Sequence, residues 1–296
     1  MAEEQDLILF ENQLPYFLLQ ELYQELYQKK HDLPCSWPTP SNDHSIETDK
    51  AKGPHDALIE LTCEFFKDYK KGKPVENIGT PKHFTDLVRH FQCPDKAKDG
   101  KHNSTPVQNI YAAKKLRASG VKFRPLKDGP FIIKIDEATK CKFNLACVRN
   151  MDLKLTPFGV KEDETECVVQ NIMALEQFLY PDKPYICNYF LLMDQLVDTL
   201  DEVDLLVENK VIINMLGSKN ALAKLVDRLC EQIMDDPSCY FGISDQLNKH
   251  YENFWNCHVA TLKRVYFKDL WTGSSTVLGV FVLLFSVSGT TKYLMS

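Results

Sequence analysis

The chain has 296 residues, of which 44% are hydrophobic and 26% are charged, and its formal net charge is −6. This length can bury one large core or two smaller ones, and the acidic balance excludes a general electrostatic attraction to nucleic acid. The ten cysteines form no Cys-x-x-Cys pair, so we expect reduced thiols in a cytosolic environment rather than a disulfide framework. The chain opens with the acidic stretch MAEEQD, which is unlike a signal peptide.

A leucine repeat near the N-terminus predicts the first helix. Within 6–27, a leucine recurs at every fourth position, which is the spacing of one helical face. Asn12 is a candidate cap of this helix, and Pro15 suits its first turn. We expect the repeat to be under-packed and to form a broad apolar surface, which marks a partner-binding or aggregation site. The repeat consists of Leu14, Leu18, Leu22 and Leu26.

Three further helices are predicted before the middle of the chain. Apolar residues recur at helical spacing over 57–69 and 84–91, and an Ala-rich helix is predicted over 107–119, with Gly120 directly after its end. Two polar segments, about 30–54 and 94–106, lack large apolar side chains and are predicted to be mobile loops.

The pattern changes over 121–160, where apolar and polar residues alternate. This alternation predicts a small antiparallel sheet of two to four strands, inserted between two helical halves. The second half is predicted to contain helices over 163–179, 185–200, 205–216 and 218–233, and a last helix from about residue 243 that runs almost to the C-terminal apolar segment. The expected fold class is therefore mainly α with a small antiparallel β insert (α+β).

The C-terminal segment from Leu270 to Thr291 contains no charged side chain. A helix of this length would reach about 30 Å, the thickness of the hydrocarbon core of a bilayer. We expect a single transmembrane helix over 270–291, which follows a helical domain over 1–269 and precedes a short tail over 292–296. The alternative is a buried core helix, since only 277–287 is densely apolar. The expected anchor residues are Leu270, Trp271, Val277, Leu278, Val280, Phe281, Val282, Leu283, Leu284, Phe285 and Val287.

Motifs that carry chemistry are missing from the sequence. It contains no P-loop, GxGxxG, GxSxG or HExxH pattern. Ser119 begins an SxxK pattern without the partner motifs of that chemistry, and His83, His90 and Cys93 lack an evident fourth metal ligand. His250 lies beside a core stripe and is interpreted as a core histidine. We therefore expect no enzymatic activity, no metal or other cofactor, and no small-molecule substrate.

Five blocks of sequence are distinctive in their order and spacing. They are FENQLPYFLLQELY (10–23), AAKKLRASGVKF (112–123), DETECVVQNIMALEQ (163–177), VDLLVENKVIINMLGS (203–218) and WNCHVATLKRVYFKDLW (255–271). Together they resemble the plant family called domain of unknown function 247, over essentially the whole chain. The resemblance implies a mainly helical domain with a C-terminal transmembrane segment and no established enzymatic activity. In grasses, some members of the family are implicated in self-incompatibility.

Two features depart from the family pattern. The family carries a further block before the LENQLP-like motif, whereas this chain begins almost at that motif. The stretch MDLKLTPFGV (151–160) stands where relatives have a Gly-x-Leu-x-Ile-Pro-Pro-like segment.

We expect a membrane-anchored plant protein that acts as a non-catalytic recognition or interaction module and binds an unidentified protein. The alternatives are an uncharacterised membrane-bound enzyme, whose site is assembled from dispersed residues, and a truncated remnant of a longer family member.

The charges beside the apolar segment predict its orientation. Lys263, Arg264 and Lys268 precede the segment, and only Lys292 follows it. The positive-inside bias then places the large domain in the cytosol, at the plasma membrane or an endomembrane, after post-translational insertion. Asn103 begins an Asn-Ser-Thr sequon, and this candidate glycosylation site matters only if the domain is luminal or extracellular.

Overall fold

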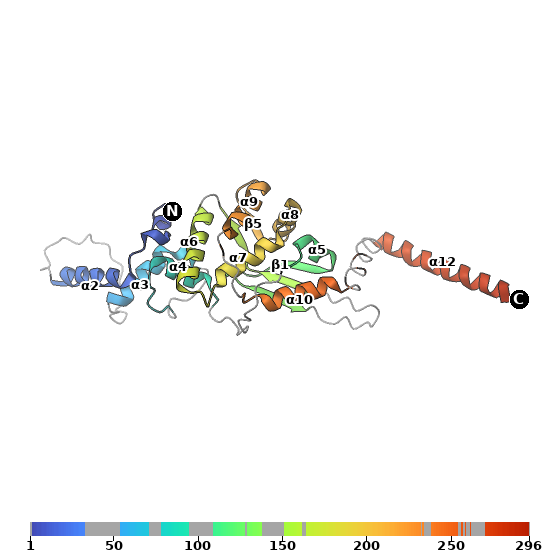
Figure 1. Ribbon diagram of the computed structural model, residues 1–296, viewed down its shortest axis with the longest axis horizontal. Helices are drawn as coiled ribbons and strands as arrows, with labels where there is room; N and C mark the ends of the chain where they lie inside the picture. Colours follow the sequence, from blue (N-terminus) through green and yellow to red (C-terminus); the bar gives the residue numbers. More distant parts are fainter. Residues whose placement is uncertain are drawn as a thin grey trace, which may run out of the picture.

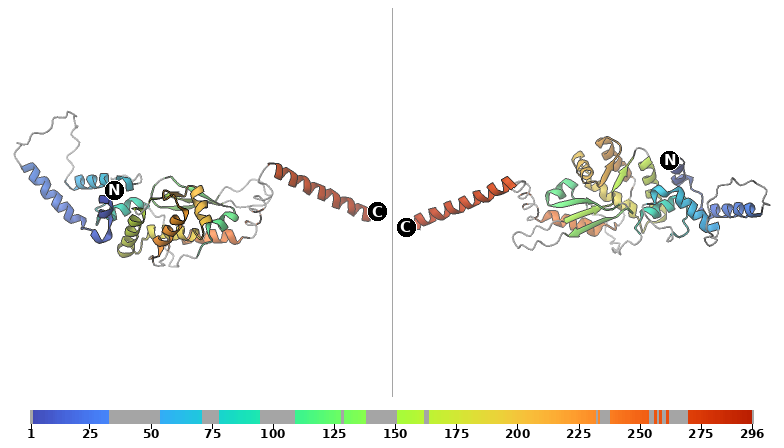
Figure 2. Two further views of the ribbon diagram at one scale, coloured as in Figure 1. Left: turned by 90° about the horizontal axis from the view of Figure 1, so that it is seen from above. Right: turned by 180° about the vertical axis from the view of Figure 1, so that it is seen from behind.

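The computed structural model describes most of the chain and shows a helical body between two projecting helices. The described residues are 2–32, 54–70, 78–94, 109–127, 129–137, 151–161, 164–231, 233, 238–253, 256, 258, 261 and 270–295. Helix α2 (Tyr16–Asp32) lies at one end of the molecule and α12 (Leu270–Met295) at the other (Figure 1, Figure 2). The remaining helices and the 3-10 turns are α1 (Ala2–Ile8), η1 (Phe10–Asn12), α3 (Pro54–Phe65), η2 (Lys67–Tyr69), α4 (Phe84–Gln92), α5 (Ala113–Ala118), α6 (Glu164–Leu179), α7 (Tyr185–Leu196), α8 (Leu200–Glu208), α9 (Lys219–Cys230) and α10 (Phe241–Glu252).

Four strands lie within the predicted β region 121–160 and a fifth lies outside it, and the larger sheet is mixed. Strand β3 (Met151–Leu155) lies between β1 (Val121–Pro125) and β2 (Ile133–Glu137), parallel to the first and antiparallel to the second. Strand β4 (Phe158–Val160) pairs in parallel with β5 (Ile212–Asn214). The prediction of a purely antiparallel sheet is therefore wrong, as is the prediction of one helix over 205–216. The α+β class is confirmed.

The core forms where α7 packs against the sheets. Along β3, alternate residues are buried, as expected for a strand with one face on the core. Phe131, Phe158, Tyr189 and Phe190 form an aromatic cluster with ring centroids 4.7 to 6.2 Å apart. Each such side chain contributes about 1.5–3 kcal/mol by leaving water. Helices α6, α7 and α9, which the sequence predicts over 163–179, 185–200 and 218–233, each contribute buried apolar side chains to this core.

Several helix boundaries differ from the prediction for local reasons. The segment 6–27 is broken by η1, and Asn12 does not cap α2, because it lies in this turn and its amide donates to Asp6 O at 3.2 Å. Helix α7 ends at Leu196 because Thr199 begins α8 in a capping box with Glu202. Helix α10 ends at Glu252, where Asn253 adopts an extended backbone conformation, so the helix predicted from about residue 243 is interrupted there.

Other boundaries follow the predicted chemistry. Helix α5 is shorter than predicted, but Gly120 follows it with φ 98°, a left-handed conformation that favours glycine after a helix. Ser218 caps α9 by accepting a hydrogen bond from Ala221 N at 3.3 Å. The first residue of the helix predicted over 163–179 and most of the two predicted loops lie outside the described residues, although α2 continues to Asp32.

The C-terminal segment is helical throughout α12, which contains every expected anchor residue. In the part of the chain that the structure describes, no helix combines the length and the apolarity needed to cross a membrane. The transmembrane helix predicted over 270–291 is therefore not confirmed. The side chains of Leu270, Trp271, Val277 and Val280 lie outside the described part, as does Asn103.

Candidate functional site

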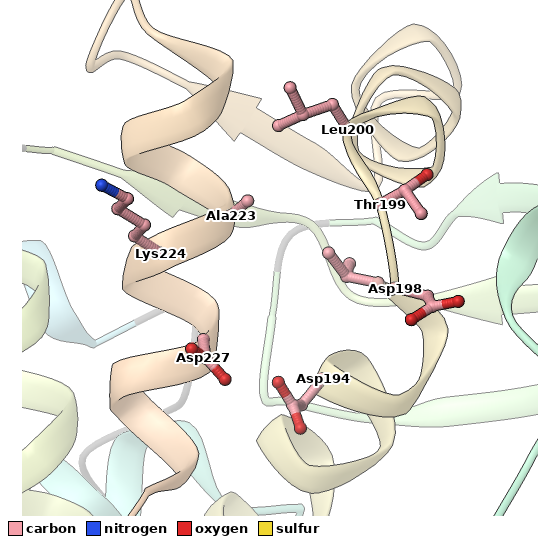
Figure 3. Close-up of a pocket in the computed structure, with 8 residues that line it drawn as sticks. Asp194, Asp198, Thr199, Leu200, Ala223, Lys224 and Asp227 are labelled. Atoms are coloured by element: carbon pink, nitrogen blue, oxygen red, sulfur yellow. The ribbon is translucent and has the colours of Figure 1, made fainter.

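A pocket of about 310 Å³ opens between α9 and the connection from α7 to α8 (Figure 3). Helix α7 supplies Asp194, and α9 supplies Asp227 from the other side. The close-up places these two carboxyl groups near each other at one end of the pocket. The residues that line the pocket are Asp194, Val197, Asp198, Thr199, Leu200, Ala223, Lys224 and Asp227.

The environment of Asp194 favours the protonated form of its carboxyl group. Burial of Asp194, followed by the charge of Asp227, raises the pKa of Asp194 to about 6. A carboxyl group with such a pKa can take up and release a proton near neutral pH. The hydroxyl of Thr199 is already engaged, because it caps α8 and contacts the Glu202 carboxylate. The pocket therefore supplies one carboxyl group, that of Asp194, that can exchange a proton near neutral pH, while its hydroxyl serves the helix cap.

A second charged cluster lies deep in the body and joins α4, α6 and α7. Glu176 is fully buried, and its Oε1 accepts a hydrogen bond from Arg89 Nε at 2.9 Å. Its Oε2 accepts hydrogen bonds from the backbone N–H groups of Ile186 and Cys187 at 2.9 and 3.0 Å. Burial raises the pKa of Glu176, and the Arg89 guanidinium and these N–H groups oppose that rise.

The guanidinium of Arg89 makes two further contacts. Arg89 Nη2 donates to Lys183 O at 2.8 Å, and the guanidinium lies 4.1 Å from the ring centroid of Tyr180. Tyr180 in turn donates to Asp86 Oδ1 at 2.7 Å. Because these polar groups satisfy one another, the cluster fastens α4 and α6 to the start of α7 and leaves little capacity for a ligand.

The candidate residues from the sequence are explained by packing. Ser119 Oγ donates to Leu116 O at 2.8 Å, so the SxxK serine closes the end of α5. His250 is buried, with its Nε2 3.0 Å from Ser119 O, which confirms it as a core histidine. Cys93 Sγ lies 3.7 Å from Glu176 Oε1, within the buried cluster. Among the described residues, no group of three His, Cys, Asp or Glu side chains is placed to hold a metal ion.

The leucine repeat at the N-terminus faces solvent. Tyr16 is buried against α3, where its hydroxyl lies 3.0 Å from Thr62 Oγ1, but the opposite side of α2 is uncovered in this single chain. We call this side the α2 apolar face; it consists of Phe17 (56% exposed), Leu18 (39%), Leu22 (57%) and Leu26 (66%). Helix α3 likewise exposes Leu61 and Phe65, because its core face is formed by Ile59, Thr62, Cys63 and Phe66. The expected under-packing of α2 is confirmed beyond Tyr16.

Sequence reasoning did not find the pocket carboxyl pair. Asp194 and Asp227 are 33 positions apart, and each looks like an ordinary polar residue on an amphipathic helix. One signal was available, because Asp194 interrupts the otherwise apolar run FLLMDQL on α7. A carboxyl group within such a run is expected to be partly desolvated, and hence to have a raised pKa.

Comparison with known proteins identifies the family. The model of the family DUF247, described as "plant protein of unknown function", matches residues 2–285. A UPF0481 protein of Arabidopsis thaliana is 24% identical over 329 aligned residues, which cover 99% of this chain and 60% of that protein. The chain thus spans less than two thirds of the length of this relative. No solved structure matches the chain. The chain therefore belongs to the DUF247 family of plant proteins of unknown function.

Proposed function

We propose that this chain is a membrane-attached, non-catalytic recognition module, with α12 as its attachment and the helical body as its interaction domain. The observation that carries the proposal is the exposure of α12. Its described large apolar side chains, which include five consecutive residues, are each 54% to 75% exposed. They are Leu278, Phe281, Val282, Leu283, Leu284, Phe285 and Val287.

Five consecutive residues cover every side of a helix, since each is turned by about 100° from the last. A helix that is apolar all round is normally buried in protein or in lipid. Both views in Figure 2 show α12 pointing away from the body, so the body does not cover it. A lipid environment would cover all sides of α12 at once, which favours the membrane over a single partner helix.

The features of the body support recognition rather than catalysis. It exposes the α2 apolar face, and its buried charged cluster is occupied in holding helices together. The rival function is that of a membrane-bound enzyme with its site in the pocket beside Asp194, where the raised pKa would suit acid–base chemistry. The engaged hydroxyl of Thr199 supports the non-catalytic proposal.

Removal of Leu270–Ser296 is expected to release the chain from membranes. Membranes from cells that express the full chain and the shortened chain would be washed with alkaline carbonate and sedimented. The full chain should remain in the pellet, and the shortened chain should move to the supernatant, because its apolar helix is gone. A full chain with Leu22→Glu and Leu26→Glu is the control, and it should stay in the pellet. A shortened chain that resists carbonate extraction would contradict the proposal.

We further propose that the body lies on the cytosolic side. The basic residues before α12 support this orientation, and so do six cysteines that form no disulfide in the described part of the chain, Cys63, Cys93, Cys167, Cys187, Cys230 and Cys239. Endoglycosidase treatment of the membrane-bound chain is therefore expected to leave its electrophoretic mobility unchanged. A mobility shift that an Asn103→Gln variant lacks would place the body on the luminal or extracellular side.

A further inference from the structure

The α2 apolar face is large for a surface that stays in water. The exposed parts of Phe17, Leu18, Leu22 and Leu26 amount to about 400 Å². The largest apolar patch on a typical monomer is about 300–600 Å² and is often functional. A protein interface of standard size buries about 800 Å² per partner, including a polar rim. One copy of this face therefore supplies most of the apolar contact area for one such interface.

The leucines of this face can pack against an identical set. Leu18, Leu22 and Leu26 lie four residues apart and form a ridge along α2. Ridges of this spacing on two helices fit into each other's grooves in the commonest class of helix packing. Leu22 and Leu26 are the most exposed leucines of the face. Helix α2 lies at one end of the molecule and projects from the body (Figure 1), where a second copy can approach it.

The charges of α2 favour one orientation of such a pair. Glu21 and Glu25 lie in the middle of the helix, and Lys29 lies one turn further on; all three side chains are exposed. Parallel alignment of two copies would place these charged rows on opposite sides of the contact, where they could not meet. Antiparallel alignment places the two rows side by side and brings Lys29 of one copy toward the glutamates of the other.

From these observations, we propose that α2 pairs with the α2 of a second copy of this chain. The two helices run antiparallel, with a two-fold axis near Gln24, and the leucines of both α2 apolar faces meet across it. This pairing deepens the proposed recognition function by naming one partner, and it does not depend on membrane attachment. The oligomeric state of the chain in detergent tests the pairing, and sedimentation with membranes tests the attachment, so the two proposals can fail separately.

Analytical ultracentrifugation of the full chain in detergent micelles tests the interface. The wild-type chain is expected to dimerise, and a variant with Leu22→Glu and Leu26→Glu should raise the dimer dissociation constant about a hundredfold or more, because four buried leucines become charged. A variant with Phe178→Glu and Met215→Glu is the matched control. It changes two side chains that are 74% and 56% exposed on other elements, and it should dimerise like wild type. Far-UV circular dichroism checks that each variant folds.

Charge reversal at exposed positions of α2 tests directly whether the partner is a second copy of this helix. A basic variant (Glu21→Lys with Glu25→Lys) and an acidic variant (Lys29→Glu) should each dimerise at least tenfold more weakly than wild type. An equimolar mixture of the two should form dimers again, since each chain now complements the other. A wild-type chain that stays monomeric at about 100 micromolar, where even a weak interface forms, would overturn the proposal. A dimer that survives Leu22→Glu with Leu26→Glu would also overturn it. Mixing without recovery would overturn it as well.

Discussion

Replacement of Glu176 by alanine is expected to lower the free energy of unfolding by about 3–5 kcal/mol. The substitution leaves the Arg89 guanidinium, which is only 8% exposed, without its carboxylate partner. It also removes the acceptor of the N–H groups of Ile186 and Cys187, which lie in the first turn of α7. Such first-turn donors have no partner within their own helix. The loss therefore combines an unpaired buried charge with two unsatisfied backbone donors.

Urea unfolding of the full chain in mild detergent, followed by circular dichroism, measures this effect. Glu166→Ala is the matched control, because Glu166 lies on the same helix and pairs with Arg228 at 2.9 Å near the surface. Surface pairs of this kind contribute about 0–1 kcal/mol. Glu176→Gln should fall between the two, since the amide oxygen still accepts from the backbone while the charge is lost. If Glu176→Ala costs no more than Glu166→Ala, the buried cluster does not fasten the helices as described.

The sequence predicts this fold well where the signal is local. The apolar positions of α6, α7 and α9, and the residues Gly120 and Ser218 at helix ends, follow from spacing and capping chemistry. The helix predicted over 185–200 runs past Thr199, because apolar residues continue at helical spacing up to it, although Thr199 and Glu202 have capping-box spacing. The sequence therefore contains both signals, and the structure follows the capping box.

Long-range pairing is less visible in the sequence. Strands β4 and β5 are about 50 positions apart, and a three-residue strand carries too little alternation to predict its partner. The leucine repeat of α2 shows the opposite case. Its periodicity correctly predicts an apolar face, but periodicity says nothing about what covers that face, and in a single chain it remains exposed. The pocket also depends on tertiary packing, because α7 and α9 must meet before Asp194 and Asp227 can interact.

Replacement of Asp194 by asparagine is expected to stabilise the chain above neutral pH and to remove a pH dependence. The pKa of Asp194 is about 6 in the folded chain, whereas an unperturbed aspartate has a pKa of about 3.9. Between these values the folded state retains a proton that the unfolded state has lost, so stability falls as pH rises. The stabilising contribution is complete below about pH 4 and is lost as the pH passes through about 6.

The size of this effect follows from the shift and from the exposure of the group. Two pKa units correspond to nearly 3 kcal/mol, but Asp194 is only half-buried, and solvent screening reduces the effect to about 1–2 kcal/mol. The free energies of unfolding of wild type and Asp194→Asn should therefore be similar near pH 4 and differ by that amount near pH 8. Asp198→Asn is the matched control, because this exposed carboxylate lines the same pocket. It should follow the wild-type profile, and parallel profiles for all three chains would show that Asp194 is not desolvated by the contact between α7 and α9.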